Sequence, residues 1–254
     1  MNKNDHSNKK IGRLQAAFAA VCGLGLLVWF TGAHNAVGDL VSDLRSYGPD
    51  RCAGIGDVCP DGSVYAGRTP DGNMFMFATP EDAPNRLPWS IVPGLPASDM
   101  ENCAVRRDVG QRAASCSTGR ANTALLAAQA DASPSYPAAN YCAALDAHGH
   151  GDWYLPAIDE LGVLYRNRAR VGGFKLSHEW SKPMQQDVRI GTYWSSSEYR
   201  DTSSSNIVPN LSVAVARDFA GMNQEDHLYA GKGEALRVRC VRQEPVPGLR
   251  PAFR

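Results

Sequence analysis

The sequence predicts an α+β fold in which two helices pack on small antiparallel sheets, stapled by disulfides, behind an N-terminal membrane helix. Three observations lead to this fold class: an apolar run at residues 14–33, two helical apolar stripes between residues 137 and 165 with short strand patterns, and six cysteines beyond the apolar run. A chain of 254 residues is long enough to bury a sizeable core. Lysine plus arginine and aspartate plus glutamate number 26 each, so no positive field favours nucleic acid as a partner.

The apolar run, LQAAFAAVCGLGLLVWFTGA, has the length of about 20 residues that a helix needs to cross a bilayer. Basic residues in the segment 1–13 precede it, which predicts that this segment is cytoplasmic and that the rest is exported. A cleaved signal peptide is the alternative, because Thr31-Gly32-Ala33 has the small-x-small pattern of a cleavage site. We therefore expect anchoring through residues 14–33 at a bacterial cell surface or in the periplasm, or secretion if the run is removed.

The exported part divides into four segments by composition. Apolar residues at helical spacing predict a helical stalk, and proline-rich sequence predicts a disordered tail. The expected segments are a stalk at 34–50, a loop-rich lead-in with short strands at 51–119, a compact core at 120–242 and a disordered tail at 243–254. Within the lead-in, Asp71-Gly72 between the apolar runs 63–67 and 73–79 predicts a β-hairpin.

Two helices are predicted in the core. The first runs from about Pro137 to Ala147, since proline is tolerated in a first turn. The second begins after Pro156 and carries an apolar stripe made by Ile158, Leu161, Leu164 and Tyr165. Asp159 and Glu160 lie in its first turn, where the helix dipole favours negative charge, and are expected to face away from the stripe.

The turn HGHGDW between these helices poses a choice between a metal site and a structural turn. His148 and His150 are two residues apart, and no third ligand is near them in sequence. We interpret both as solvated turn residues, with Asp152 fixing the turn and Trp153 packing into the core.

Export favours disulfides for the six cysteines, because the compartment is oxidising. Six cysteines permit many pairings. Proximity favours Cys52–Cys59 and Cys103–Cys116, and Cys142–Cys240 then remains as the bridge that closes the longest loop. A zinc site is the alternative, but the C-x2-C spacing that such sites use is absent.

An ordered set of motifs carries a family resemblance over about residues 60–242. The motifs are VYAGRTPDGNMFMFATPEDAP (64–84), GRANTALLAA (119–128), PAANYCAAL (137–145), DWYLPAIDELGVLY (152–165), YWSSSEY (193–199) and VRCVR (238–242). Together they resemble the bacterial DUF1566 family, which also forms the C-terminus of the Legionella collagen-like adhesin, and the upstream motif resembles the lead-in of members attached to pili and phage. The resemblance implies a C-type-lectin-like fold, related to formylglycine-generating enzymes, in which a helix cysteine is tied to the last strand.

Two departures from the family pattern limit what the resemblance implies. Ala157 stands where the family has a serine or threonine cap, so this helix start is expected to be weaker by roughly 0.5–2 kcal/mol. The segment VAVARDFAG (213–221) keeps only Phe219 and Gly221 of an aromatic–aspartate–glycine pattern, so ligand preference does not carry over. Val208-Pro209-Asn210 stands without a W-N-D motif, and we expect no calcium and no other cofactor.

The segment SSSEYRDTSSSNIVPN (195–210) reads as a polar loop, and polar loops on rigid scaffolds commonly bind ligands. The predicted ligand-binding residues are Ser196, Ser197, Glu198, Tyr199, Arg200, Asp201, Asn206 and Asn210. The leading hypothesis is a surface-anchored or pilus-associated, adhesin-like module for a glycan or protein. The alternatives are a minor pilin-like subunit, with pilus or homo-oligomer assembly, and an exported enzyme related to formylglycine-generating enzymes. We favour the non-enzyme reading, because no catalytic motif such as G-x-S-x-G occurs.

Overall fold

A computed structural model places the expected lead-in and core in one compact unit, Gly48–Arg254, which is distinct from a first unit, Met1–Tyr47. The structure describes residues 52, 54–92, 97, 100, 101, 103, 114–129, 135–176, 179–181, 186–188, 191–199, 212–221 and 227–246. The expected membrane segment 14–33 and the stalk lie outside these residues. Within the described part of the chain, no helix is long and apolar enough to span a bilayer.

The first sheet joins the lead-in to the C-terminal end of the core. Strands β1 (Val64–Arg68), β2 (Met74–Ala78) and β8 (Val241–Pro245) are antiparallel in the order β1-β2-β8. The predicted hairpin is confirmed, with Gly72 at φ 75° and the Asp71 carboxylate accepting from Thr69 and Asn73. The tail boundary after residue 242 is wrong, because β8 continues to Pro245 along the whole of β2.

The second sheet lies on the other side of the core and is also antiparallel. Its strands are β5 (Thr192–Glu198), β6 (Val213–Asp218) and β7 (Leu228–Gly231), in that order, so β6 is central. A further pair of short strands, β3 (Glu179–Ser181) and β4 (Gln186–Val188), forms a separate two-stranded ladder.

Among the described residues the helices are α2 (Gly119–Ala128), α3 (Pro137–Ala143) and α4 (Ile158–Val171), and a 3-10 turn, η1 (Ala114–Cys116), precedes α2. Helix α2 was not predicted. Helix α3 ends four residues before the predicted end at 147, because the chain then turns back between Ala147 and His150. His148 and Gly149 adopt positive φ angles in that turn, which a continuing helix does not allow.

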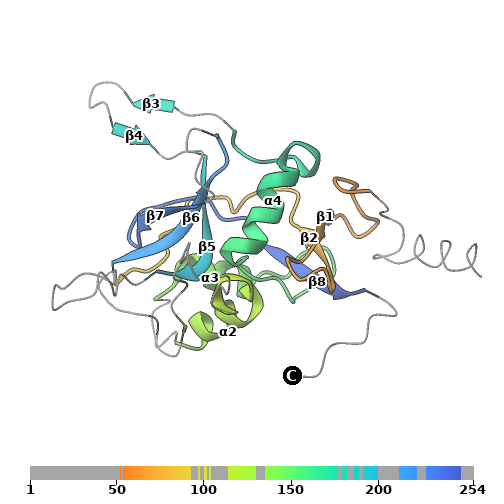
Figure 1. Cartoon of the computed structure of the whole chain (residues 1–254), viewed down its shortest axis with the longest axis horizontal. Helices are drawn as coiled ribbons and strands as arrows, with labels where there is room; N and C mark the ends of the chain where they lie inside the picture. The colour runs from red at the N-terminus through yellow and green to blue at the C-terminus, as the bar shows by residue number, and fades with distance from the viewer. Residues whose placement is uncertain are drawn as a thin grey trace, which may run out of the picture. The chain divides into compact units, whose positions relative to one another are not determined.

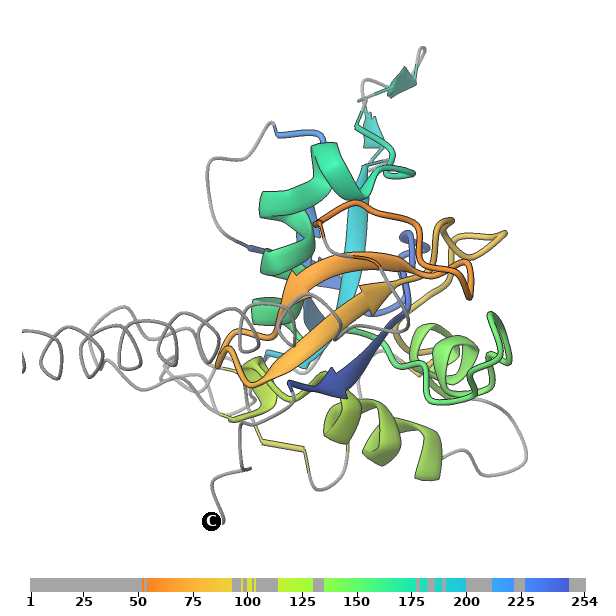
Figure 2. The same cartoon turned by 90° about the vertical axis from the view of Figure 1, so that its right-hand side faces the viewer.

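Helix α4 packs between the two three-stranded sheets (Figures 1 and 2). Its apolar residues share one buried cluster with side chains from β1, β2, β5, β6 and β8. A second cluster, built around Trp89, Trp153 and Trp194, fills the space between α2, α3 and the other face of the second sheet. A third, smaller cluster joins the Cys52–Cys59 disulfide to Phe75, Phe77 and Val246. The fold is therefore mixed α and β, and its two larger clusters share strands β5 and β6.

Three disulfides form, and their pairings are those expected from the sequence. Cys52–Cys59 and Cys103–Cys116 close short loops of the lead-in, and Cys142–Cys240 ties α3 to the residue before β8. Cys142 and Cys240 are both buried in the tryptophan-rich cluster, so this bridge crosses the core.

The start of α4 is capped by the side chain of its own Glu160 and by a tertiary contact, because Ala157 has no capping group. Ala157 offers no cap, but the Ile158 N–H donates to the Ser197 hydroxyl at 3.0 Å. Glu160 turns back so that its carboxylate accepts from the Ala157 N–H at 2.8 Å and the Gly119 N–H at 3.2 Å. The expectation that Glu160 faces away from the core is therefore wrong, and its side chain is buried because the uncapped amides need an acceptor.

The histidines of the turn are bound to the lead-in and are half-buried, so their interpretation as solvated is corrected. His150 Nε2 lies 3.0 Å from Asp61 Oδ2, and His148 Nδ1 lies 3.1 Å from the Asp61 carbonyl. Hydrogen bonds from Ser63 and His150 lower the pKa of Asp61 against the opposing effect of burial. The turn thus fastens the segment just after Cys59 to the core, and Trp153 packs inside as predicted.

Candidate functional site

Strand β5 accounts for the first residues of the expected polar loop. Ser195, Ser196, Ser197 and Glu198 lie in this strand and are fully buried, so their placement in an exposed loop is wrong. The serine hydroxyls are used inside the protein: Ser195 donates to the Val215 carbonyl at 2.6 Å, and Ser197 donates to the Ser115 carbonyl at 2.9 Å. Ser196 accepts from the Asn122 side chain of α2. A polar strand is stable here because its hydroxyls are satisfied.

Glu198 ends β5 as one half of a fully buried ion pair. Its Oε1 atom lies 2.5 Å from Lys232 Nζ and also accepts from the Ala97 N–H at 3.0 Å. The ammonium group of Lys232 lies 4.9 Å from the centroid of the Trp89 ring. A buried charge of either sign is costly alone, so these contacts hold the ends of β5 and β7 in one arrangement.

Tyr199 follows Glu198 and is half-buried, and its ring lies against the exposed Tyr229 of β7. The centroids of the Tyr199 and Tyr229 rings are 4.1 Å apart with an interplanar angle of 33°. The His227 ring lies edge-on to Tyr229 at 5.4 Å, and its Nε2 atom is 3.3 Å from the Tyr229 hydroxyl. We call Tyr199, His227 and Tyr229 the aromatic ledge.

Strand register explains why the ledge and the ion pair form together. Glu198 pairs with Ala214, and Ala214 pairs with Ala230, so these three residues share one face of the sheet. Small alanines on that face leave room for the ion pair to span β6. Alternation along the strands puts Tyr199 and Tyr229 on the opposite face.

Four predicted ligand-binding residues, Arg200, Asp201, Asn206 and Asn210, lie outside the described residues, as does the Val208-Pro209-Asn210 motif. The structure therefore brings Tyr199 of the predicted set to the surface and adds two residues, His227 and Tyr229, that the sequence analysis missed. The signal for them was the short alternating stretch HLYAG at 227–231. Over the described ranges, no group of three histidine, cysteine or acidic side chains is placed to hold a metal ion.

A family model of the Lcl C-terminal domain matches residues 79–242. The chain belongs to this family. No curated protein is significantly similar to it. The match begins one residue after β2 and ends inside β8, so the first sheet of this Lcl C-terminal domain is completed by a hairpin from upstream of the matched region.

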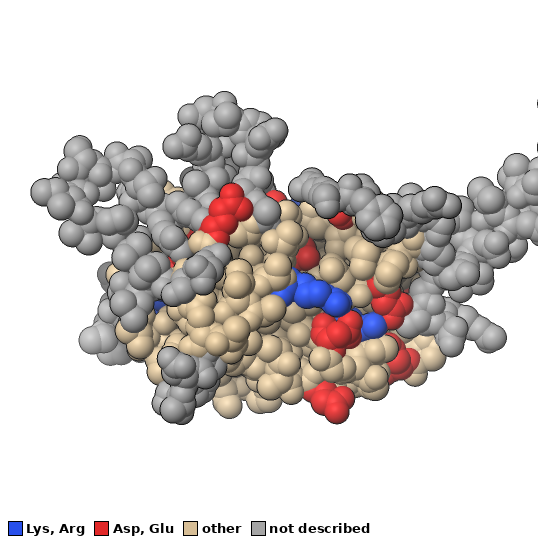
Figure 3. All heavy atoms as spheres, turned by 90° about the horizontal axis from the view of Figure 1, so that it is seen from below, with Lys and Arg blue, Asp and Glu red and all other residues tan. Residues whose placement is uncertain are grey.

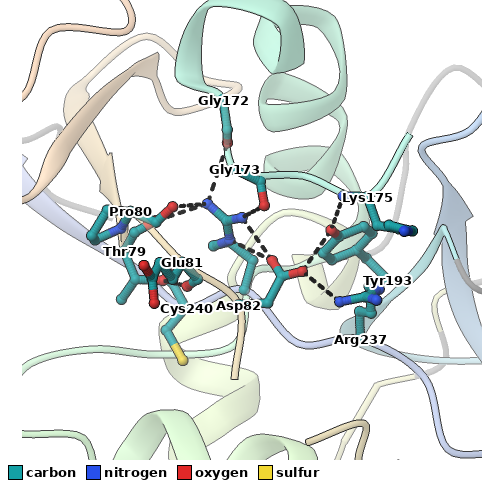
Figure 4. A network of polar contacts seen from close by, with 11 residues as sticks. Thr79, Pro80, Glu81, Asp82, Gly172, Gly173, Lys175, Tyr193, Arg237 and Cys240 are labelled. Atoms are coloured by element: carbon teal, nitrogen blue, oxygen red, sulfur yellow. Dashed lines mark hydrogen bonds and ion pairs between the residues drawn. The ribbon is translucent and has the colours of Figure 1, made fainter. Parts of the chain in front are cut away.

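A polar network of this Lcl C-terminal domain centres on Asp82 (Figure 4). The Asp82 carboxylate accepts from Arg239 at 2.7 Å, from Tyr193 at 2.8 Å and from Arg237 at 3.1 Å. The Arg239 guanidinium is buried and also donates to the carbonyls of Thr79, Pro80, Gly172 and Gly173. Burial and the neighbouring Asp82 raise the pKa of Tyr193. The network ties the segment after β2 to the end of α4.

Charges of both signs lie on the surface of this Lcl C-terminal domain. On the face seen in Figure 3, lysine and arginine atoms lie beside aspartate and glutamate atoms. Arg120 and Arg242 both pair with Asp152 at 2.9 Å, and Arg242 also pairs with Glu244. This arrangement produces no field of a single sign over these residues.

Proposed function

We propose that the chain is an exported, adhesin-like binding module that recognises a glycan or a protein through the aromatic ledge and the segments joined to it. The observation that carries this proposal is the ledge itself. Half-exposed aromatic rings that are held by a rigid sheet are well suited to contact a ligand at low entropic cost. Segments 200–211 and 222–226 are joined directly to Tyr199 and His227, so the predicted Arg200, Asp201, Asn206 and Asn210 belong to the same proposed surface.

Membership of the Lcl C-terminal domain family supports a role at the bacterial surface. We propose a C-type-lectin-like scaffold, since α3 is tied by Cys142–Cys240 to the last strand as the resemblance implies. We further propose that residues 14–33 anchor the chain in a membrane, and that it acts alone or on a pilus. Membrane fractionation with N-terminal sequencing tests the anchor, and a mature chain that begins at His34 would show a secreted form.

Binding of the purified full chain to cells tests the proposed function. The chain, kept in mild detergent because of its apolar run, is fluorescently labelled and titrated onto cells and onto glycan and protein arrays. We expect saturable binding that survives chelation of calcium, because we propose that binding needs no cofactor.

Two variants locate the binding surface. Tyr199→Ala removes one of the two tyrosine rings of the ledge and should weaken binding, whereas Leu125→Ala on the exposed side of α2 should leave it unchanged. The Leu125 side chain is a matched control because it is also a partly exposed apolar group. Equal binding by the native and the reduced, unfolded chain would refute a specific module, as would a complete lack of saturable binding.

A further inference from the structure

We propose that Glu160, Tyr154 and Gln243 form a pH-sensitive switch, a chain of hydrogen bonds that reverses its direction when Glu160 gains or loses a proton. The chain joins the starts of α2 and α4 to strand β8. It goes beyond the proposed function and does not depend on it, because the switch is built from groups inside the fold and needs no ligand.

The two oxygens of the Glu160 carboxyl group have different partners. Oε2 accepts from the backbone N–H groups of Ala157 at 2.8 Å and Gly119 at 3.2 Å. Oε1 faces the hydroxyl of Tyr154 at 2.9 Å. A neutral carboxyl group has one carbonyl oxygen that accepts and one O–H group that donates. The arrangement therefore suits the protonated form, with the carbonyl oxygen at Oε2 and the O–H group at Oε1.

The Tyr154 hydroxyl lies between two side-chain oxygens. It is 2.9 Å from Glu160 Oε1 and 3.1 Å from Gln243 Oε1. A hydroxyl has a single hydrogen, so it can donate fully to one of these oxygens. When Glu160 carries a proton, it donates to Tyr154, and Tyr154 donates to Gln243. Each group of the chain then has a hydrogen-bond partner, as buried polar groups require.

Loss of the proton from Glu160 to bulk water reverses the chain. The Tyr154 hydroxyl then donates to the carboxylate and needs a donor on its other side. A half-turn of the Gln243 amide supplies this donor, because it exchanges the amide oxygen for the NH2 group. Glu160 and Tyr154 are fully buried, whereas Gln243 is half-buried, so the amide is the group that turns.

The surroundings of the two buried groups place the change near neutral pH. Burial, and to a smaller extent the negative charge of Asp71 in the β1–β2 turn, raise the pKa of Glu160 to about 7. Burial and the neighbouring Glu160 raise the pKa of Tyr154 well above its ordinary value. Tyr154 therefore keeps its proton while Glu160 titrates.

Charged groups from α2, β8 and the segment before α4 surround the outer end of the chain. Arg120 of α2 donates to the backbone carbonyl of Gln243 at 3.4 Å and lies 5.7 Å from the centroid of the Tyr154 ring. Arg120 and Arg242 of β8 both pair with Asp152 at 2.9 Å. Against the opposing effect of burial, these two arginines lower the pKa of Asp152. These groups keep their charges near neutral pH, so they do not titrate with the switch.

The position of the chain links the proton to two parts of the fold. Tyr154 is held to Val241 by two backbone hydrogen bonds, at 2.8 and 2.9 Å, and Gln243 pairs with Met76 of β2. Ionisation strengthens the bond from Gly119 at the start of α2, because a charged acceptor binds more strongly than a neutral one. The same event turns the Gln243 amide on β8. One proton thus changes the contacts of both elements.

Nuclear magnetic resonance of the full chain in mild detergent tests the switch. Glutamate is labelled with ¹³C at the side-chain carboxyl carbon and glutamine with ¹⁵N at the side-chain amide, and the pH is varied from about 5 to about 9, on both sides of the expected midpoint. We expect the Glu160 carboxyl resonance to titrate near pH 7, well above its ordinary value of 4.5. The Gln243 amide resonances should shift with the same midpoint, because the amide turns when the proton leaves.

Two variants and one internal control test the links of the chain. Glu160→Gln resembles the neutral acid and offers an NH2 group to Tyr154, so it should abolish the shift of Gln243. Tyr154→Phe removes the linking hydroxyl, so Glu160 should still titrate while Gln243 no longer follows it. The Gln129 amide is the matched control within the same spectra. Its oxygen accepts from the Tyr136 hydroxyl at 3.3 Å, and it should show no shift with this midpoint.

A midpoint that Glu160 and Gln243 share, and that Gln243 loses in Glu160→Gln, supports the switch. The inference is overturned if Glu160 titrates near 4.5, if Gln243 stays constant while Glu160 titrates, or if Gln243 still follows Glu160 in a folded Tyr154→Phe variant. Near-UV circular dichroism shows whether each variant is folded. If Tyr154→Phe does not fold, the comparison of the native chain with Glu160→Gln decides the outcome. Binding to cells at a fixed pH tests the proposed function separately.

Discussion

Gly119 at the start of α2 occupies a position where a methyl group has no space. A Cβ atom added there would lie 2.2 Å from Glu160 Oε2, 2.5 Å from the Ala157 nitrogen and 2.9 Å from the Leu155 carbonyl oxygen. Two of these neighbours are backbone atoms and the third is a buried carboxylate that holds three donors. We therefore predict that Gly119→Ala destabilises the domain, although alanine is the better helix former.

Three contributions determine how much the free energy of unfolding should fall in Gly119→Ala. Relief of the overlap requires backbone shifts of the kind that cost about 1–3 kcal/mol in overpacked cores. The same shift lengthens the 3.2 Å bond from Gly119 to Glu160, and an unsatisfied buried amide costs about 1–3 kcal/mol. Alanine recovers at most about 1 kcal/mol of helix propensity. The net loss should be roughly 2–4 kcal/mol.

Denaturant titration and thermal unfolding of the full chain measure this loss. For a unit of this size, about 1 kcal/mol corresponds to roughly 2–4 °C, so the melting temperature should fall by about 5–15 °C. Gly151→Ala is the matched control, since a Cβ there meets nothing within 4 Å. If Gly119→Ala proved as stable as Gly151→Ala, the proposed packing of α2 against the start of α4 would be wrong.

The remaining predictions concern Glu160, the long disulfide and the buried ion pair. Burial raises the pKa of Glu160 to about 7 from 4.5, against three donors that lower it, so the folded state keeps a proton that the unfolded state loses. Stability should therefore fall by about 3 kcal/mol as pH rises from about 4.5 to 7, and Glu160→Gln should remove that slope in pH-dependent unfolding. Replacing Cys142 and Cys240 with alanine should cost about 2–5 kcal/mol, more than opening Cys52–Cys59, in the same unfolding assay. Lys232→Met should cost about 3–5 kcal/mol by leaving Glu198 buried alone, and adding Glu198→Leu should restore stability; equal stabilities of the single and double variants would count against the pair.

Local patterns made part of the fold predictable. The Asp71-Gly72 hairpin and the apolar stripe of α4 are set by residues close in sequence, and their positions in the structure agree within one or two residues. The three disulfides could be assigned because two pairs are near neighbours, which leaves one partner for Cys142. In these cases, residues close in sequence are enough to predict the structure.

Helix α2 was missed because its inward face is polar. Asn122 and Thr123 are buried, and their side chains bond to the carbonyls of Ser115 and Leu155. Such residues give no hydrophobic periodicity, and the rest of the helix is largely alanine. The acceptors come from η1 and from the segment before α4, which no local pattern in α2 indicates.

Strand β5 misled the sequence analysis for the same physical reason. The run SSSE has the composition of a loop, yet each polar group finds a buried partner on another element. Hydroxyls can replace apolar groups in a core when backbone acceptors are in reach, because the satisfied hydrogen bond offsets the cost of burial. The acceptor for Ser195 is set by the register with β6, which is a property of the sheet.

The aromatic ledge shows how much of a candidate site can be predicted from separate segments of the sequence. Tyr199 was predicted as a surface contact because it follows a polar run, but its partner Tyr229 lies 30 residues later in the chain, on β7, with β6 between the two strands. Only the register of β6 with both neighbours brings Tyr199 and Tyr229 together while placing Glu198 and Lys232 behind them.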